Sequence, residues 1–139
     1  MALTVTVTMP PEQGDAVLDT LLTLYQALAE ALQLSTLTYL DDQRSLGPVL
    51  ERRDELVEVE ALIDLLGWSF GRVDPVELTG APGLVRETVY ATLVDAAERF
   101  AQDIDRYEHG EIELERVQEQ ASACAVLFSA FMRLERSGP

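Results

Sequence analysis

Apolar and polar residues alternate strictly at the start of the chain and follow a helical period over most of the remainder. Residues 3–9 read Leu-Thr-Val-Thr-Val-Thr-Met, and this period of two, with its β-branched side chains, predicts a half-buried strand. Pro10 and Pro11 end it. A strand needs a partner, and the other alternating stretch is 35–40. We therefore expect the strand to pair with residues 35–40, unless these extend the preceding helix, or to pair across a dimer.

Helical periodicity predicts four amphipathic helices, over about 15–34, 48–66, 83–109 and 111–136. The first begins at Gly14 or Asp15, a favourable N-cap residue. Pro48 suits the first turn of the second helix, and Gly67 is a typical helix stop. Because the link between the last two helices is very short, they are predicted to form an antiparallel hairpin.

The last two helices each have a continuous apolar face, which we assign to the core. In the third helix it comprises Val85, Val89, Leu93, Ala96, Phe100, Ile104 and Tyr107. In the fourth it comprises Val117, Ala121, Cys124, Phe128 and Phe131. Val126 and Ala130 fall opposite that second face. Helix four is therefore apolar on two sides, as is typical of a central helix or one in a subunit interface.

Length and composition favour one core. A chain of 139 residues, of which 47% are apolar, falls in the size range of a single domain. We predict a mainly α protein, a single four-helix bundle-like domain with a short N-terminal β-strand element. No apolar run reaches the roughly 20 residues of a membrane span, and the first ten residues lack the features of a signal peptide. A cytoplasmic protein is expected.

Charge and cysteine content exclude several classes of function. The chain has 25 acidic and 10 basic residues and a formal charge of −15, so it would repel nucleic acid and anionic membranes but attract a basic protein partner. One cysteine and one histidine exclude an intrachain disulfide and a zinc thiolate cluster, and they leave little material for nucleophilic catalysis. No cofactor is predicted.

Acidic side chains at apolar helix positions are the strongest candidates for a site. At about 100° per residue, Glu60 falls between apolar residues of the second helix, and Arg53 and Asp64 flank the same stripe. Asp103 lies on the apolar face of the third helix. A buried carboxylate must pair with an arginine, hold a metal or face a wet cleft. Arg53 and Arg99 are the arginines expected to pair with these acids.

A magnesium site is the alternative interpretation of these acids. Pairs such as Glu60 with Asp64 are similar to half of the acidic motif by which all-α nucleotide pyrophosphohydrolases hold magnesium. Residues 90–95 lack the second acidic pair. A magnesium-dependent all-α hydrolase acting on a nucleotide-like phosphate would use Glu60, Asp64 and Asp103, and these carboxylates would have to converge around one open position.

Two aromatic residues follow the second helix in a stretch, 67–83, that contains four glycines and two prolines. This composition predicts a long irregular connection. Trp68 and Phe70 are its expected anchors, either as a lid on the bundle or as part of a binding surface. Together with the two-sided fourth helix, these features favour a non-enzymatic protein that forms a twofold homodimer and binds another protein, as a regulator, inhibitor or assembly factor.

Overall fold

The computed structural model describes residues 4–42, 46–69 and 74–136 of the chain. Its elements follow the order β1 (Val5–Met9), α1 (Pro11–Asp42), α2 (Gly47–Ser69), β2 (Val76–Gly80), α3 (Pro82–Glu108) and α4 (Leu114–Arg136). The prediction of a mainly α protein with a short N-terminal strand is confirmed. No helix among the described residues is long and apolar enough to cross a membrane.

The N-terminal strand finds its partner within the chain, but not where the sequence suggested. β1 pairs antiparallel with β2, with Val7 opposite Leu78 and Thr6 opposite Thr79. The hydroxyls of Thr6 and Thr79 lie 2.9 Å apart on the outer face, while Val7 and Leu78 are buried. The prediction that 67–83 is an irregular connection is therefore wrong for 76–80, where a short apolar alternation continues into a glycine.

Residues 35–40 belong to α1, so the prediction that they form a strand is wrong. The threonines that create their alternation bond to the helix itself, because Thr36 Oγ1 donates to Leu32 O at 2.8 Å and Thr38 Oγ1 donates to Leu34 O at 2.9 Å. Threonine hydroxyls commonly bond in this way to the carbonyl four residues back. The same residues that raise β propensity are thus accommodated on a helix.

Three helix ends also differ from their predicted positions. α1 begins at Pro11 rather than at Gly14 or Asp15, because proline is favourable in a first turn, where its missing N–H has no helical partner. α2 continues past Gly67 to Ser69. α4 begins at Leu114, not at 111, after a turn in which Gly110 has a φ of 72°.

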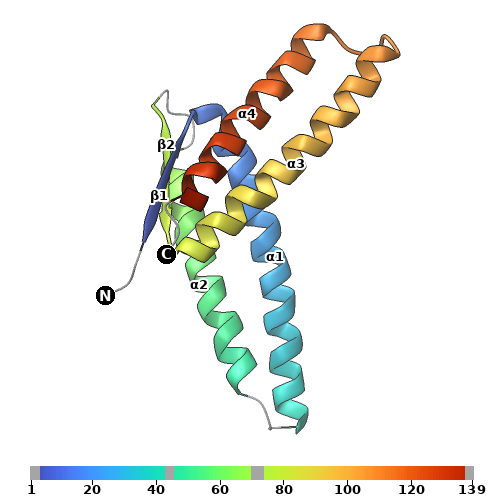
Figure 1. Ribbon diagram of the computed structural model, residues 1–139. Coiled ribbons are helices and arrows are strands. Elements are labelled where there is room, and N and C mark those ends of the chain that lie inside the picture. The colour runs from blue at the N-terminus through green and yellow to red at the C-terminus, as the bar shows by residue number, and fades with distance from the viewer. Residues whose placement is uncertain (1–3, 43–45, 70–73, 137–139) are drawn as a thin grey trace.

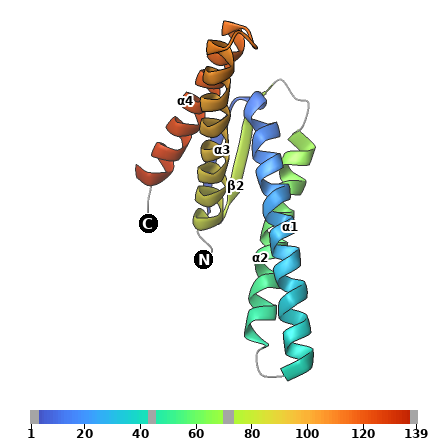
Figure 2. The same ribbon diagram turned by 90° about the vertical axis from the view of Figure 1, so that its right-hand side faces the viewer.

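The helices form two antiparallel hairpins that share one core and extend away from it in opposite directions (Figure 1). α1 and α2 make one hairpin and α3 and α4 the other. The start of α1 and of α3, the end of α2 and of α4, and both strands meet in the middle of the molecule. Figure 2 shows the same separation of the two hairpins from the side.

The core lies where the hairpins meet the sheet. Its buried apolar residues are Val7, Met9, Val17, Leu21, Leu28, Val59, Leu62, Leu66, Val76, Leu78, Val85, Val89, Ala130 and Leu134. The predicted face of α3 is buried at Val85, Val89 and Ala96, but Ile104 and Tyr107 are exposed because they lie beyond this core. The assignment of Phe128 to the core is wrong, since α4 instead buries Leu127, Ala130 and Leu134.

Candidate functional site

The two candidate acids of α2 lie at the surface. Glu60 and Asp64 are exposed, so the prediction that Glu60 points into the core, with Asp64 beside the same apolar stripe, is wrong; Val59, Leu62 and Leu66 occupy the buried face instead. Glu60 has a partner, because the Tyr25 hydroxyl of α1 donates a hydrogen bond to Glu60 Oε1 at 3.1 Å. The hydrogen bond and the charge of that carboxylate raise the pKa of Tyr25 above its ordinary value.

The other candidates on and after α2 do not assemble around Glu60. Arg53 is exposed and contacts its neighbour Asp54, with 3.5 Å between Nη2 and Oδ1. Trp68 lies in the last turn of α2, and its side chain lies outside the described part of the structure. Phe70 also lies outside the described residues. Their predicted role as anchors of a lid or binding surface remains a prediction.

Asp103 is the one candidate acid that is buried. Its side chain is 8% exposed and lies between two arginines of the α3–α4 hairpin, with Arg106 Nη1 at 3.9 Å and Arg116 Nε at 3.8 Å. Arg99, one of its expected partners, instead contacts Asp95 at 3.1 Å. Asp103 therefore stabilises the outer part of the hairpin by linking α3 to α4.

The three carboxylates of the hydrolase interpretation do not converge. Glu60 and Asp64 lie on one hairpin and Asp103 on the other (Figure 1). Within residues 4–42, 46–69 and 74–136, no three histidine, cysteine, aspartate or glutamate side chains come close enough together to hold a metal ion. The geometry thus gives no support to catalysis by these residues.

The outer half of the α1–α2 hairpin exposes leucine side chains that sequence reasoning did not single out. Leu34, Leu37 and Leu40 are 66%, 52% and 62% exposed, and their spacing places them on the side of α1 opposite its core residues. Leu46, which directly precedes α2, and Leu50 on α2 are likewise exposed. The spacing of these leucines is visible in the sequence, but the β-like alternation over 35–40 obscures it.

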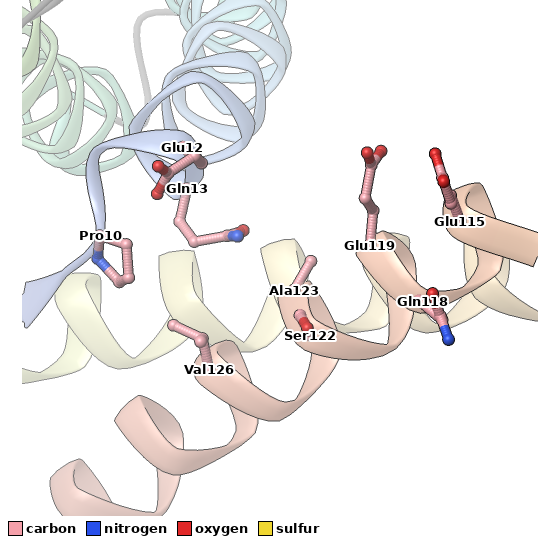
Figure 3. Close-up of a pocket in the computed structure, with 9 residues that line it drawn as sticks. All are labelled: Pro10, Glu12, Gln13, Glu115, Gln118, Glu119, Ser122, Ala123 and Val126. Atoms are coloured by element: carbon pink, nitrogen blue, oxygen red, sulfur yellow. The ribbon is translucent and has the colours of Figure 1, made fainter.

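A trough runs along α4, on the side that faces the start of α1 and β1. It consists of three adjoining hollows of about 680, 660 and 530 Å³. Figure 3 shows the first, where Ser122, Ala123 and Val126 of α4 lie across open space from Pro10 and Gln13. Glutamates line this end, at Glu12, Glu115 and Glu119. Arginines line the far end, at Arg133 and Arg136.

Comparison with protein-family models, with curated proteins and with solved structures finds no match for this chain.

Proposed function

We propose that this protein acts by binding other proteins, as a regulator, inhibitor or assembly factor, and that the outer half of the α1–α2 hairpin is its principal binding element. The observation that carries the proposal is the row of outward leucines at 34, 37 and 40. The same helix segment packs its opposite side on α2. A helix that is apolar on both sides is normally covered on both sides.

The extent of the molecular surface supports this proposal. A compact monomer of 15.4 kDa exposes about 7,200 Å². This chain exposes 9278 Å², because both hairpins extend beyond the shared core. The difference of about 2,000 Å² exceeds the roughly 800 Å² that each partner buries in a standard-size protein–protein interface.

Charge restricts the chemistry of the partner. The α1–α2 hairpin that carries these leucines also carries exposed acids, among them Glu30, Asp41, Glu51 and Glu58, and the whole chain has a charge of −15. A complementary partner offers an apolar groove flanked by arginine or lysine, which would both speed encounter and fix orientation. We therefore propose a basic protein as the partner.

Self-association is the second part of the proposal. β1 has one edge that β2 does not cover, and α4 exposes a long face along its trough. Both features are favourable for a twofold homodimer. The magnesium-dependent hydrolase is not proposed, since the separation of Glu60 and Asp64 from Asp103 leaves it without a common position for a metal and a substrate.

The test compares partner recovery by the wild type and by Leu37→Glu/Leu40→Glu, using tagged protein cross-linked in its native cells. We expect a basic protein to be cross-linked to the wild type and lost with the variant, because charge on this face costs desolvation in the complex but not in the free protein. The control is Thr23→Glu/Gln26→Glu, with equal charge, on exposed residues of α1 nearer the sheet. Equal recovery with all three proteins would contradict the proposal.

A further inference from the structure

One face of α4 has a self-complementary order of charges. Residues spaced alternately by four and three form a single stripe along a helix, as in a coiled-coil seam. Here that stripe consists of Glu115, Glu119, Ser122, Val126, Ser129, Arg133 and Arg136. It begins with two acids, ends with two bases and has one valine between two serines at its centre. Six of the seven residues are exposed and Val126 is half-buried, so the stripe is available to a partner.

All seven stripe residues line the trough, in sequence order. The first hollow is lined by Glu115, Glu119 and Ser122. Val126 lines both the first and the second hollow, and Ser129 lines the second hollow. Arg133 lines the second and third and Arg136 the third. The chain's own elements therefore leave the stripe residues at the walls of three adjoining hollows, and neighbouring hollows share Val126 or Arg133.

We propose that a second copy of this chain packs its own α4 antiparallel on the stripe, about a twofold axis at Val126. In that register Val126 meets its symmetry mate and Ser122 faces Ser129 of the other copy. Glu119 then lies opposite Arg133, and Glu115 opposite Arg136. Each ion pair forms twice, because the interface of a twofold dimer is isologous.

The charge order excludes the other simple arrangement of two helices. A parallel pair would place Glu115 and Glu119 against the same residues of the second copy, and the arginines against arginines. Like charges at such close positions are unfavourable in an interface. The antiparallel register converts all of these contacts to attraction, although each chain has a net charge of −15.

The trough provides positions for both the small residues and the arginines. Ser122 and Ser129 flank Val126 with short side chains, which permits the two helix axes to approach at the short end of the usual 8–10 Å. Arg133 is already oriented along the wall of the trough, where its Nη2 donates to Thr8 O at 3.3 Å. The acidic end, which includes Glu12, would receive the arginines of the second copy.

Charge reversal tests this register. Glu115→Arg/Glu119→Arg makes both ends of the stripe basic, and Arg133→Glu/Arg136→Glu makes both ends acidic. We expect wild-type protein at about 100 µM, well above a micromolar dissociation constant, to give a light-scattering mass near twice 15.4 kDa. Each double variant alone should give a mass near that of the monomer, which at this concentration requires a dissociation constant of about 1 mM or more, roughly a thousandfold increase. An equimolar mixture of the two should recover the dimer.

The control variant is Glu98→Arg/Glu108→Arg, which makes the same change in net charge as Glu115→Arg/Glu119→Arg at exposed positions of α3 and should leave the dimer intact. Circular dichroism melts establish that each variant is folded. A monomeric wild type, a dimer that survives either reversal, or a mixture that fails to recover the dimer would overturn the proposal. Since no substitution touches the α1–α2 hairpin, this outcome is independent of the test of the proposed partner surface.

Discussion

At the scale of single residues, Tyr25 of α1 and Glu60 of α2 make a contact across the hairpin, and the ionisation of the tyrosine can be followed directly. The hydroxyl donates to a carboxylate at 3.1 Å, and the pKa of Tyr25 lies above its ordinary value of 10.0 because that hydrogen bond and that charge oppose ionisation. Because the pKa of Tyr25 is higher in the folded state, the contribution of this hydrogen bond to stability is fully present below the pKa that the tyrosine has in the unfolded chain. It is lost as the pH rises through the folded value.

We predict that Glu60→Gln lowers the pKa of Tyr25, because the amide still accepts a hydrogen bond but no longer repels tyrosinate. Titration of tyrosinate absorbance measures the change, and Tyr25→Phe identifies the signal among the four tyrosines of the chain. Glu58→Gln, at an exposed position of the same helix, serves as control. A titration that Glu60→Gln leaves unchanged would disprove the role assigned to the carboxylate.

Periodicity located one of the two acids predicted to point inward, Asp103, correctly and misplaced the other, Glu60, for a physical reason. Asp103 lies on a helix with a distinct apolar face and is buried as predicted. Glu60 and Asp64 lie on α2, which has exposed apolar residues such as Leu50 and Val57 in addition to its buried ones. A helix with apolar residues on every side does not define its inward direction, so only the packing of the whole chain determines it.

At the scale of elements, the close approach of α1 to β2 depends on a residue without a side chain. Gly14 is buried in α1, and a Cβ built on it would lie 3.2 Å from Val76 Cγ2. We predict that Gly14→Val forces the strand away from the helix and destabilises the protein by about 1–3 kcal/mol, as is usual for overpacking.

Urea unfolding measures this effect, with Gly83→Ala as the control. The Cβ of that alanine would have no neighbour within 4 Å. It should leave the free energy of unfolding unchanged or raise it by up to about 1 kcal/mol, through the restricted unfolded chain. If Gly14→Val unfolds at the same urea concentration as wild type, the predicted packing of α1 on β2 is wrong.

Elements were predictable from the sequence where their signal is local. The four helices and the first strand each have their own periodicity. The second strand does not: residues 76–80 are five in number, lie among glycines and prolines, and form a strand by pairing with residues more than 60 positions earlier. Such a nonlocal pairing stabilises a segment that is too short to be recognised by itself.

At the scale of the whole molecule, a charge of −15 on one small chain opposes the compact state. Added sodium chloride shortens the screening length to about 3 Å at 1 M, so we predict that the melting temperature rises with salt. Chloride is preferred to sulfate here, because sulfate also stabilises proteins by exclusion from their surface. The measurement uses Glu115→Arg/Glu119→Arg, expected to be monomeric, to separate folding from association. A flat or falling melting temperature would contradict the prediction.

The arrangement of the two hairpins could not be derived from their sequences. Similar apolar patterns are required by a continuous four-helix bundle and by two hairpins that share only their inner ends. The feature that distinguishes the two arrangements is the insertion of β2 between α2 and α3. That insertion leaves the outer halves of both hairpins, and the stripe of α4, outside the core. The exposed surfaces on which the proposed function depends are therefore a consequence of the topology.

The central claim is that the surfaces left outside the core bind other protein chains, and its most direct test is self-cross-linking at Val126 of the α4 stripe. In a Cys124→Ala background, Val126→Cys would place two thiols on the twofold axis, where a disulfide requires Cα atoms about 4.4–6.8 Å apart. Phe128→Cys, on an exposed position away from the stripe, is the control. Mild oxidation should convert most Val126→Cys molecules into a covalent dimer and leave Phe128→Cys monomeric, whereas equal rates for the two variants would contradict the account.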